Sequence, residues 1–336
     1  MEQKNDNYEH LVYVECMTYN QSNYIEDALR GFVMQRTDFP FVCMIMDDAS
    51  TDGEQEIIKS FLKQEFDLST MDRAEDEEAE TIIAKHNTND NCTFVICLLK
   101  ENHWNTKQDK GHLLSKWRDH SKYIALCEGD DYWTDSRKLQ IQYDFLEKNR
   151  EISLCFHSVK VLKAACNTLV DDFLTRDVPG VSTILDLLKG NYIHTPSVMY
   201  RFDNTYSDKI HAMGMTYVGD YPMWMLCAQK GNLYKIEESM AVYRLGSGFW
   251  SSKGFSYTYP RWIVMLSKLY PLMDDSVKPA IDQAIEEYVI LIERNYRNEL
   301  DGIKASCSYK IGQALLCPFK FISLLLKRLK GLIINS

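Results

Sequence analysis

The sequence lacks the marks of several large classes of protein. It contains no run of about 18 apolar residues, which is the length that a membrane-spanning helix needs. Its first residues show no basic segment followed by an apolar one, as a secretory signal would. None of its ten cysteines forms a C-x-x-C pair, which disfavours a zinc site or a disulfide framework and favours buried free thiols. We therefore expect a cytoplasmic protein.

Positive charge is scarce as well. Lysine and arginine number 38 against 48 aspartate and glutamate residues, which gives a formal net charge of -10. Because binding to a nucleic-acid backbone requires a basic surface, this balance argues against duplex nucleic acid as a partner. An acidic protein can still bind a phosphorylated small molecule when a divalent cation lies between the two.

Strands and helices alternate in the first part of the chain. Residues 11–17 form an apolar, β-branched run typical of a buried strand, and apolar positions then recur at helical spacing over 25–33. A second apolar run over 41–46 is followed by helical spacing from Ile57. This order predicts an α/β fold with a mainly parallel sheet flanked by helices. Ligands of such sheets bind at the carboxyl ends of the strands.

Two segments depart from this pattern. Residues 64–91 are strongly acidic, and we interpret them as an insertion that forms a solvated loop or a short exposed helix. Beyond about residue 258 the character becomes helical, with a long amphipathic helix predicted over 277–300. We therefore divide the chain into an α/β domain over 1–257 and a helical extension over 258–336.

The end of the extension is basic and amphipathic. Over residues 318–334, apolar side chains share one helical face, and Lys320, Lys327 and Lys330 share another. This pattern fits docking on a membrane surface. Packing of the same helix on the domain or on a second subunit is the alternative, and the sequence leaves both open.

Acidic residues stand at three element ends where a cleft is expected. Asp47 and Asp48 follow the second strand, Asp130 and Asp131 follow an apolar run over 123–127, and Asp220 precedes a helix. Paired carboxylates repel each other unless a cation or hydrogen-bond donors hold them. Such hard oxygen ligands suit Mg²⁺ or Mn²⁺ together with substrate phosphates. The alternative for each pair taken singly is an ordinary turn or cap.

In this order the segments resemble the family 2 glycosyltransferases with the GT-A fold. The resemblance covers about residues 11–250. Its motifs are Thr18-Tyr19-Asn20 after the first strand, Asp47-Asp48-Ala49-Ser50-Thr51-Asp52, Glu128-Gly129-Asp130-Asp131 and Gly219-Asp220.

The resemblance implies a set of residues that bind the donor. Thr18 and Tyr19 would lie at the nucleotide, with Tyr19 stacked on the base, and Asp48 would hydrogen-bond the ring edge of the base. Asp130 would contact the ribose or phosphate side, and Asp131 would ligate the metal, Mg²⁺ or Mn²⁺. The base implied is uridine, with guanosine or thymidine as alternatives.

The resemblance also implies the chemistry on the acceptor side. Asp220 would deprotonate the acceptor hydroxyl for in-line attack at the anomeric carbon, which inverts its configuration. Tyr221 would help to enclose this base and raise its pKa. Trp133 offers a flat face to a sugar, with core packing as the alternative. His194 and Thr195 lie on the same side, although a lone histidine is more often structural.

One position departs from the family pattern. Many members carry a histidine near the end of the domain, and the matching segment around Tyr243 and Arg244 has none. Arg244 would serve the diphosphate instead, because its fork of donors suits phosphate oxygens. The alternative is an ordinary surface arginine.

The resemblance leads us to expect an inverting glycosyltransferase acting on a lipid-linked or saccharide acceptor in polysaccharide or glycolipid biosynthesis, peripheral on the inner face of the membrane. A sugar nucleotidyltransferase is a rival, but it needs a glycine-rich basic loop after the first strand, and residues 18–23 have neither glycine nor a basic residue. A non-catalytic nucleotide- or carbohydrate-binding module would not need Asp220. A glycosidase would use two carboxylates without a nucleotide.

Overall fold

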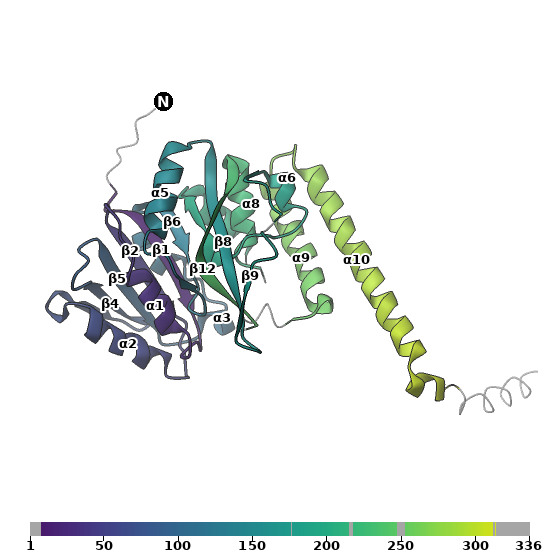
Figure 1. Ribbon diagram of the computed structural model, residues 1–336, viewed down its shortest axis with the longest axis horizontal. Coiled ribbons are helices and arrows are strands. Elements are labelled where there is room, and N and C mark those ends of the chain that lie inside the picture. Colours follow the sequence, from purple (N-terminus) through teal and green to yellow (C-terminus); the bar gives the residue numbers. More distant parts are fainter. Residues whose placement is uncertain (1–7, 176, 215–217, 247–252, 312, 314–336) are drawn as a thin grey trace, which may run out of the picture.

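The computed structural model describes residues 8–175, 177–214, 218–246, 253–311 and 313 (Figure 1). In these residues one 12-stranded sheet runs through the α/β part, in the order β10-β12-β8-β11-β6-β1-β2-β5-β4-β3, with β7 paired to β12 and β9 to β8. Helices cover both faces of the sheet. The predicted α/β class with a flanked sheet is confirmed.

The centre of the sheet is parallel. It consists of β6 (Ser121–Leu126), β1 (His10–Thr18), β2 (Phe41–Asp47) and β5 (Cys92–Leu99). Val14 of β1 pairs with Cys43 on one side and with Ala125 on the other. All seven residues of β2 are buried, as expected of a strand with helices on both faces. The strands predicted over 11–17 and 41–46 are confirmed.

Two apolar clusters lie on the two faces. The helices α1 (Ile25–Val33), α2 (Glu54–Glu65) and α5 (Lys138–Lys148) pack on the face that includes Val14. On the face that includes Tyr13 lie α4 (Gly111–Arg118), α7 (Thr205–Met213), α8 (Tyr221–Lys230), α9 (Phe255–Leu269) and the start of α10 (Lys278–Ala305). Alternation along β1 thus divides the core, because successive side chains of a strand point to opposite faces.

The remaining elements complete the sheet and its connections. These are the strands β7 (Tyr132–Trp133), β8 (Ile152–Lys163), β9 (Thr168–Asp171), β10 (Val181–Ser182), β11 (Met199–Arg201) and β12 (Asn232–Leu245), the short helices α3 (His103–Thr106) and α6 (Ile184–Leu187), and the 3-10 turns η1 (Leu68–Thr70), η2 (Thr195–Ser197) and η4 (Tyr270–Leu272).

The acidic segment 64–91 is not the loop or exposed helix that its composition predicts. It contains β3 (Asp72–Glu75) and β4 (Ala79–Lys85), an antiparallel hairpin that extends the sheet beyond β5. All of β3 is exposed, as its acidic composition indicates, but Ile82 and Ala84 of β4 are buried. Pairing with the edge of β5 therefore decides the structure, and composition alone does not reveal it.

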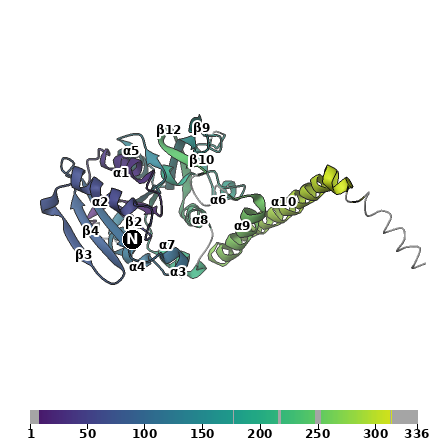
Figure 2. The same ribbon diagram turned by 90° about the horizontal axis from the view of Figure 1, so that it is seen from below.

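The helical extension begins with α9 and continues in α10, which confirms the helix predicted over 277–300. Figures 1 and 2 show α10 packing along α9 at first and then leading away from the body of the protein. None of the described helices combines the length and the apolar character needed to cross a membrane. The basic segment predicted as a helix over 318–334 lies outside the described residues.

Candidate active site

The turns that follow β1 and β2 are held together by Glu54, a residue that the sequence reasoning did not single out. Its carboxylate accepts hydrogen bonds from the hydroxyl of Thr18, from the backbone N–H of Gln21 (2.7 Å) and from the hydroxyl of Ser50 (2.9 Å). Burial raises the pKa of Glu54 above its ordinary value. The sequence gives little indication of this role, because acidic residues such as Glu54 are common in the first turn of a helix, where they interact favourably with the helix dipole.

The backbone of the same two turns is in an uncommon conformation. Asn20 has φ 53° and Ala49 has φ 62°, in the left-handed region that a side chain disfavours. Asn20 accepts a hydrogen bond from the N–H of Thr51 and donates one from its own N–H to Ser50, each at 2.8 Å. Backbone strain of this kind is often found at functional sites. Between these anchored residues, Tyr19 keeps 43% of its side chain exposed.

Asp48 is also tied into the structure. One carboxylate oxygen accepts from the N–H of His103 (2.8 Å) and the other from the N–H of Trp104 (3.3 Å), which caps α3. The ammonium of Lys110 lies 2.8 Å from the second oxygen. Asp48 thus lies at the carboxyl end of β2 as predicted, with its charge already balanced.

A cluster of three carboxylates follows β6. One oxygen each from Glu128, Asp130 and Asp131 lie within 4.8 Å of one another. Asp131 is almost fully buried, and its Oδ1 accepts from the backbone N–H of Arg244 (2.7 Å). Its Oδ2 is buried without a hydrogen-bond partner. Glu128 belongs to this cluster although the sequence reasoning gave it no role of its own.

Electrostatics makes this cluster costly to ionise. Burial and the neighbouring charge of Asp130 raise the pKa of Asp131 well above its ordinary value. Desolvation by the surrounding chain, followed by the charges of Asp130 and Asp220, raises the pKa of Glu128 to about 8 although its side chain reaches solvent. The orphaned oxygen of Asp131 and the hard oxygen donors around it fit a divalent cation such as Mg²⁺ or Mn²⁺.

A glycine allows this cluster to approach β1. A Cβ atom on Gly129 would lie 2.3 Å from the hydroxyl oxygen of Thr18 and 2.5 Å from Oε1 of Gln21. The backbone N–H of Gly129 donates to the carbonyl of Met17 (3.2 Å). The turn that carries the carboxylates therefore lies directly against the turn that carries Tyr19.

The structure contradicts the interpretation of Arg244 as an ordinary surface arginine. It is 7% exposed, and its guanidinium lies 4.8 Å from the ring centre of Tyr24 and 4.6 Å from that of Tyr132. It donates to the carbonyl oxygen of Asp130 (2.5 Å) and pairs with the carboxylate of Asp27. Arg244 thus links β12 to the carboxylate turn and places a positive charge behind it.

Asp220 lies at the N-terminus of α8, where its carboxylate accepts from the N–H of Tyr221 (2.8 Å). Burial raises the pKa of Asp220, while a hydrogen bond from Asn191 and the charge of His194 act in the opposite direction. The charge of Asp220 is the smallest of the three causes that raise the pKa of Glu128, so the two carboxylates influence each other electrostatically.

His194 is held by an acid that the sequence reasoning missed. Its Nε2 lies 3.1 Å from Oδ1 of Asp172, and both side chains are buried. The imidazole packs on the ring of Tyr243 at 4.6 Å between ring centres. Burial is the largest cause that raises the pKa of Tyr243. The negative charges of the carboxylate cluster and of Asp220 raise it further. Thr195, the next residue, is half-buried at the start of η2.

Trp133 and Tyr221 both lie in the core, which is the alternative stated for Trp133 and is compatible with Tyr221 enclosing Asp220. Trp133 is 2% exposed, donates from Nε1 to the carbonyl of Pro196 (2.9 Å) and packs on Phe32 at 4.9 Å, so it presents no open face to a sugar. Tyr221 is equally buried and donates from its hydroxyl to the carbonyl of Leu187 (2.8 Å). The apolar surroundings of both rings decide this placement, because large aromatic side chains gain most from burial.

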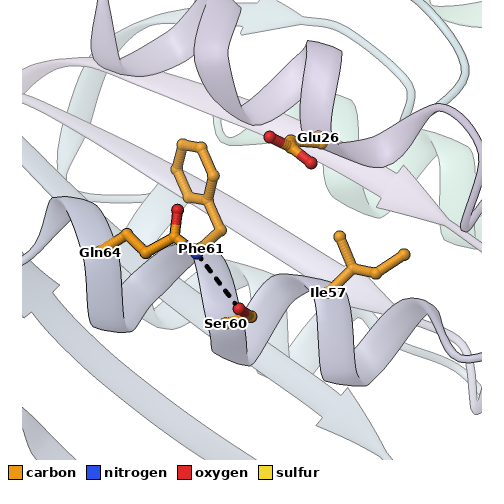
Figure 3. Close-up of a pocket in the computed structure, with 5 residues that line it drawn as sticks. All are labelled: Glu26, Ile57, Ser60, Phe61 and Gln64. Carbon is orange, nitrogen blue, oxygen red and sulfur yellow. Dashed lines mark hydrogen bonds between the residues drawn. The ribbon is translucent and has the colours of Figure 1, made fainter.

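A small cavity of about 130 Å³ lies elsewhere, between α1 and α2 (Figure 3). It is lined by Glu26, Ile57, Ser60, Phe61 and Gln64. None of the residues predicted to bind donor, metal or acceptor lines it. It is too small for a nucleotide, since ligand pockets have volumes of roughly 300 Å³ or more.

Comparisons with known proteins agree with this geometry. Residues 16–80 match the family model described as glycosyl transferase family 2. An uncharacterized protein of Mycobacterium tuberculosis is 34% identical over 245 residues, which cover 71% of this chain. The chain spans 60% of the length of that relative. TuaG of Bacillus subtilis, a proposed teichuronic acid biosynthesis glycosyltransferase, is 25% identical over 260 residues, covering 77% of this chain and 88% of TuaG.

The fold has a counterpart among solved structures. The crystal structure of residues 1–349 of S. aureus TarS in complex with UDP matches with a TM-score of 0.53 and 15% identity, over 83% of this chain and 70% of that chain. At this identity the likeness concerns the fold. The family model, the relationship to TuaG and the shared α/β architecture together support a family 2 glycosyltransferase with a fold of the GT-A type.

Proposed function

We propose that this chain is an inverting, metal-dependent glycosyltransferase that moves a sugar from a nucleotide-diphosphate donor to an acceptor hydroxyl. The observation that carries the proposal is the buried Oδ2 of Asp131, which has no hydrogen-bond partner and lies in a cluster with Glu128 and Asp130. A carboxylate oxygen left unpaired in this way is costly unless a ligand satisfies it.

The donor would occupy the carboxyl ends of β1 and β2. Tyr19 offers an exposed ring for stacking on the base, and Asp48 lies beside it with its carboxylate oriented by α3. Thr18 lies against Gly129, where the two turns meet, and with Asp130 it would contact the ribose and phosphate side of the donor. The likeness to a protein solved with UDP supports a UDP-sugar as the donor. Arg244 contributes positive charge near the leaving diphosphate.

The cation would be Mg²⁺ or Mn²⁺, held by Asp131 with Asp130 and Glu128 as neighbours. When bound, it supplies Lewis-acid stabilisation to the departing diphosphate. Its charge also compensates the three carboxylates, two of which, Glu128 and Asp131, have pKa values that are raised by burial and then by neighbouring negative charge.

Asp220 would act as the general base on the acceptor side. The acceptor oxygen forms a bond to the anomeric carbon as its proton passes to the carboxylate of Asp220. The bond from the anomeric carbon to the phosphate oxygen breaks, and its electron pair leaves with the nucleoside diphosphate. Attack opposite the leaving group inverts the anomeric configuration. The raised pKa of Asp220 strengthens it as a base near neutral pH.

For the acceptor we propose a lipid-linked or saccharide hydroxyl in polysaccharide or glycolipid biosynthesis. The relationship to TuaG supports this class of product. His194, whose charge lowers the pKa of Asp220, and its neighbour Thr195 would line the acceptor side. The basic segment 318–334 would hold a cytoplasmic protein on the inner face of a membrane, where lipid-linked acceptors are found.

The test is release of nucleoside diphosphate from a panel of UDP-, GDP- and TDP-sugars, with Mn²⁺ or with EDTA, together with nucleotide binding in the same samples. Wild type is compared with Asp131→Ala, Asp220→Asn and the control Asp72→Asn, an exposed carboxylate on β3. We expect Mn²⁺-dependent release from one donor, lost in the first two variants and kept in the control.

The outcomes separate the candidate functions. Asp220→Asn should still bind nucleotide, because only the chemical step needs the base. Binding of nucleotide without any release, unchanged in Asp220→Asn, would support a non-catalytic module instead. Failure of wild type to bind any nucleotide in the presence of Mn²⁺ would contradict the site assignment as a whole.

A further inference from the structure

Among the described residues, the second half of α10 carries an apolar face that is largely exposed, and the ring of Phe255 in α9 packs on part of it, 5.5 Å from the ring centre of Tyr296. The first half packs on α9, where Ile281 and Ala284 are buried and the ring of Tyr288 is stacked on Trp262 with 5.9 Å between ring centres. From Tyr296 to the end of the helix at Ala305, every residue is exposed. Figures 1 and 2 show this half leading away from the body of the protein.

Five apolar residues of α10 form one stripe, which we call the α10 stripe: Val289, Ile292, Tyr296, Leu300 and Ile303. Their spacings of 3, 4, 4 and 3 residues put them on one side of a helix. Four of them are between 49% and 58% exposed, and Ile292 is half-buried. A continuous exposed apolar stripe of this kind marks an interaction site.

The stripe is symmetric about Tyr296. Val289 and Ile303 lie seven residues to either side of it, and Ile292 and Leu300 lie four residues to either side. An identical helix laid antiparallel across the stripe at Tyr296 would therefore meet an apolar residue at every stripe position. Such self-complementarity is the requirement of a two-fold interface between identical subunits.

The charged residues beside the stripe also fit an antiparallel pair of identical helices. Glu286, Glu293, Arg297 and Lys304 share one flank of the helix, because their spacings of 7, 4 and 7 residues return to the same side. The two acids precede Tyr296 and the two bases follow it. In an antiparallel pair with its two-fold axis at Tyr296, this flank lies beside the same flank of the second helix, which places acid opposite base.

We propose that the α10 stripe docks on the same stripe of a second copy of this chain, antiparallel, with the two-fold axis at Tyr296. Val289 then packs on Ile303 of the partner subunit, and Ile292 packs on Leu300 of the partner subunit. Glu286 lies near Lys304 of the partner subunit, and Glu293 lies near Arg297 of the partner subunit. The proposal is independent of the catalytic function.

A membrane is the other surface that such a stripe fits, and charge disfavours it. Over Lys278–Ala305 the helix carries six acidic and four basic residues, a net charge of -2. An anionic membrane surface attracts basic segments and repels an acidic excess. The mixed flank described above suits a second protein chain better.

The first experiment measures the mass of the full chain by sedimentation equilibrium from about 1 to 100 µM. We expect a concentration-dependent rise from the 39.2 kDa monomer to twice that mass. The variant Leu300→Glu with Ile303→Glu should stay monomeric, because charges would face each other across the stripe. A control with Leu68→Glu and Leu169→Glu, at two exposed leucines elsewhere, should dimerise like wild type.

The second experiment tests orientation. Glu286→Lys with Glu293→Lys makes the flank wholly basic, and Arg297→Glu with Lys304→Glu makes it wholly acidic. Each variant alone should be monomeric, and an equimolar mixture should form a heterodimer. Because all four residues are exposed and lie on the surface of a helix, both variants should keep the circular dichroism spectrum of wild type.

Monomeric wild type at 100 µM would overturn the proposal. So would a mixture of the two charge variants that fails to pair while wild type dimerises, because the dimer would then use another surface. Binding of wild type to vesicles of anionic phospholipid that is lost in the Leu300→Glu, Ile303→Glu variant would assign the stripe to the membrane instead.

Discussion

The carboxylates of the candidate site differ in how strongly the protein resists their ionisation. Burial and the charge of Asp130 hold the pKa of Asp131 well above its ordinary value, and burial with the charges of Asp130 and Asp220 raises the pKa of Glu128 to about 8. At neutral pH a cation must therefore displace protons in order to bind. The affinity of the cluster for the cation should therefore increase with pH, because raising the pH removes the protons that compete with the cation.

We predict that the affinity for Mn²⁺ rises between pH 6 and pH 8, by up to about tenfold per pH unit for each proton displaced. Isothermal titration calorimetry in two buffers of different ionisation enthalpy measures the affinity and the number of protons released. Asp131→Asn should abolish binding, and Asp72→Asn should not change it. An affinity independent of pH would contradict the assignment of the cluster.

A second prediction concerns Asp220, whose pKa burial raises. A base must be unprotonated, so kcat/KM should fall as the pH falls through this pKa, on an acidic limb above the ordinary range of an aspartate. Asp220→Asn should lower turnover by roughly 10²–10⁴-fold. Because the charge of His194 lowers the pKa of Asp220, His194→Gln should move the acidic limb to higher pH. The exposed His211→Gln is the control, and an unmoved limb in His194→Gln would contradict the electrostatic influence of His194 on Asp220.

Among the elements, the turn from β6 to β7 depends on a single glycine. An alanine at Gly129 would place its Cβ 2.3 Å from the Thr18 hydroxyl oxygen, so one of the two turns must move. We predict that Gly129→Ala lowers the free energy of unfolding by about 1–3 kcal/mol and weakens Mn²⁺ binding. Gly219→Ala, whose Cβ would meet no atom within 4 Å, is the stability control. Equal urea midpoints for both variants would contradict the prediction.

The hairpin of β3 and β4 is an element whose acidic composition predicts a loop or an exposed helix, so composition alone does not reveal the two strands. Six acidic residues between Met71 and Glu80 indicate exposure, and β3 is exposed throughout. The alternation that buries Ile82 and Ala84 is short, and it becomes a strand only because β5 offers an open edge. A local sequence pattern does not predict hydrogen bonds to the edge of another strand.

At the scale of the whole molecule, we predict that the basic segment 318–334 governs binding to anionic membranes. Reversing Lys320, Lys327 and Lys330 to glutamate should weaken binding to phosphatidylglycerol vesicles by at least about 100-fold, since each lysine contributes about 1 kcal/mol near such a surface. A control reverses three exposed lysines elsewhere, Lys63, Lys85 and Lys163. Vesicle co-sedimentation measures the difference, and equal loss in both variants would indicate a general charge effect.

The sequence by itself determined the order of the elements and the placement of most chemistry-bearing residues. The strands before Thr18 and Asp48, the helix after Asp220 and the acids after β6 all follow from apolar periodicity and from polar residues at element ends. These are local patterns of a few residues, and the backbone geometry of strands and helices translates them directly into structure. The family resemblance needed only these segments in their order.

Only the tertiary structure decided which residues meet. Arg244 is 113 residues from Asp131, and His194 is 22 residues from Asp172, so neither contact leaves a mark in a local pattern. Trp133 and Tyr221 lie among polar site residues along the chain, yet the packing of helices on the sheet buries both rings. Burial and partnership depend on the strand order of the whole sheet, because that order brings distant segments to a common edge.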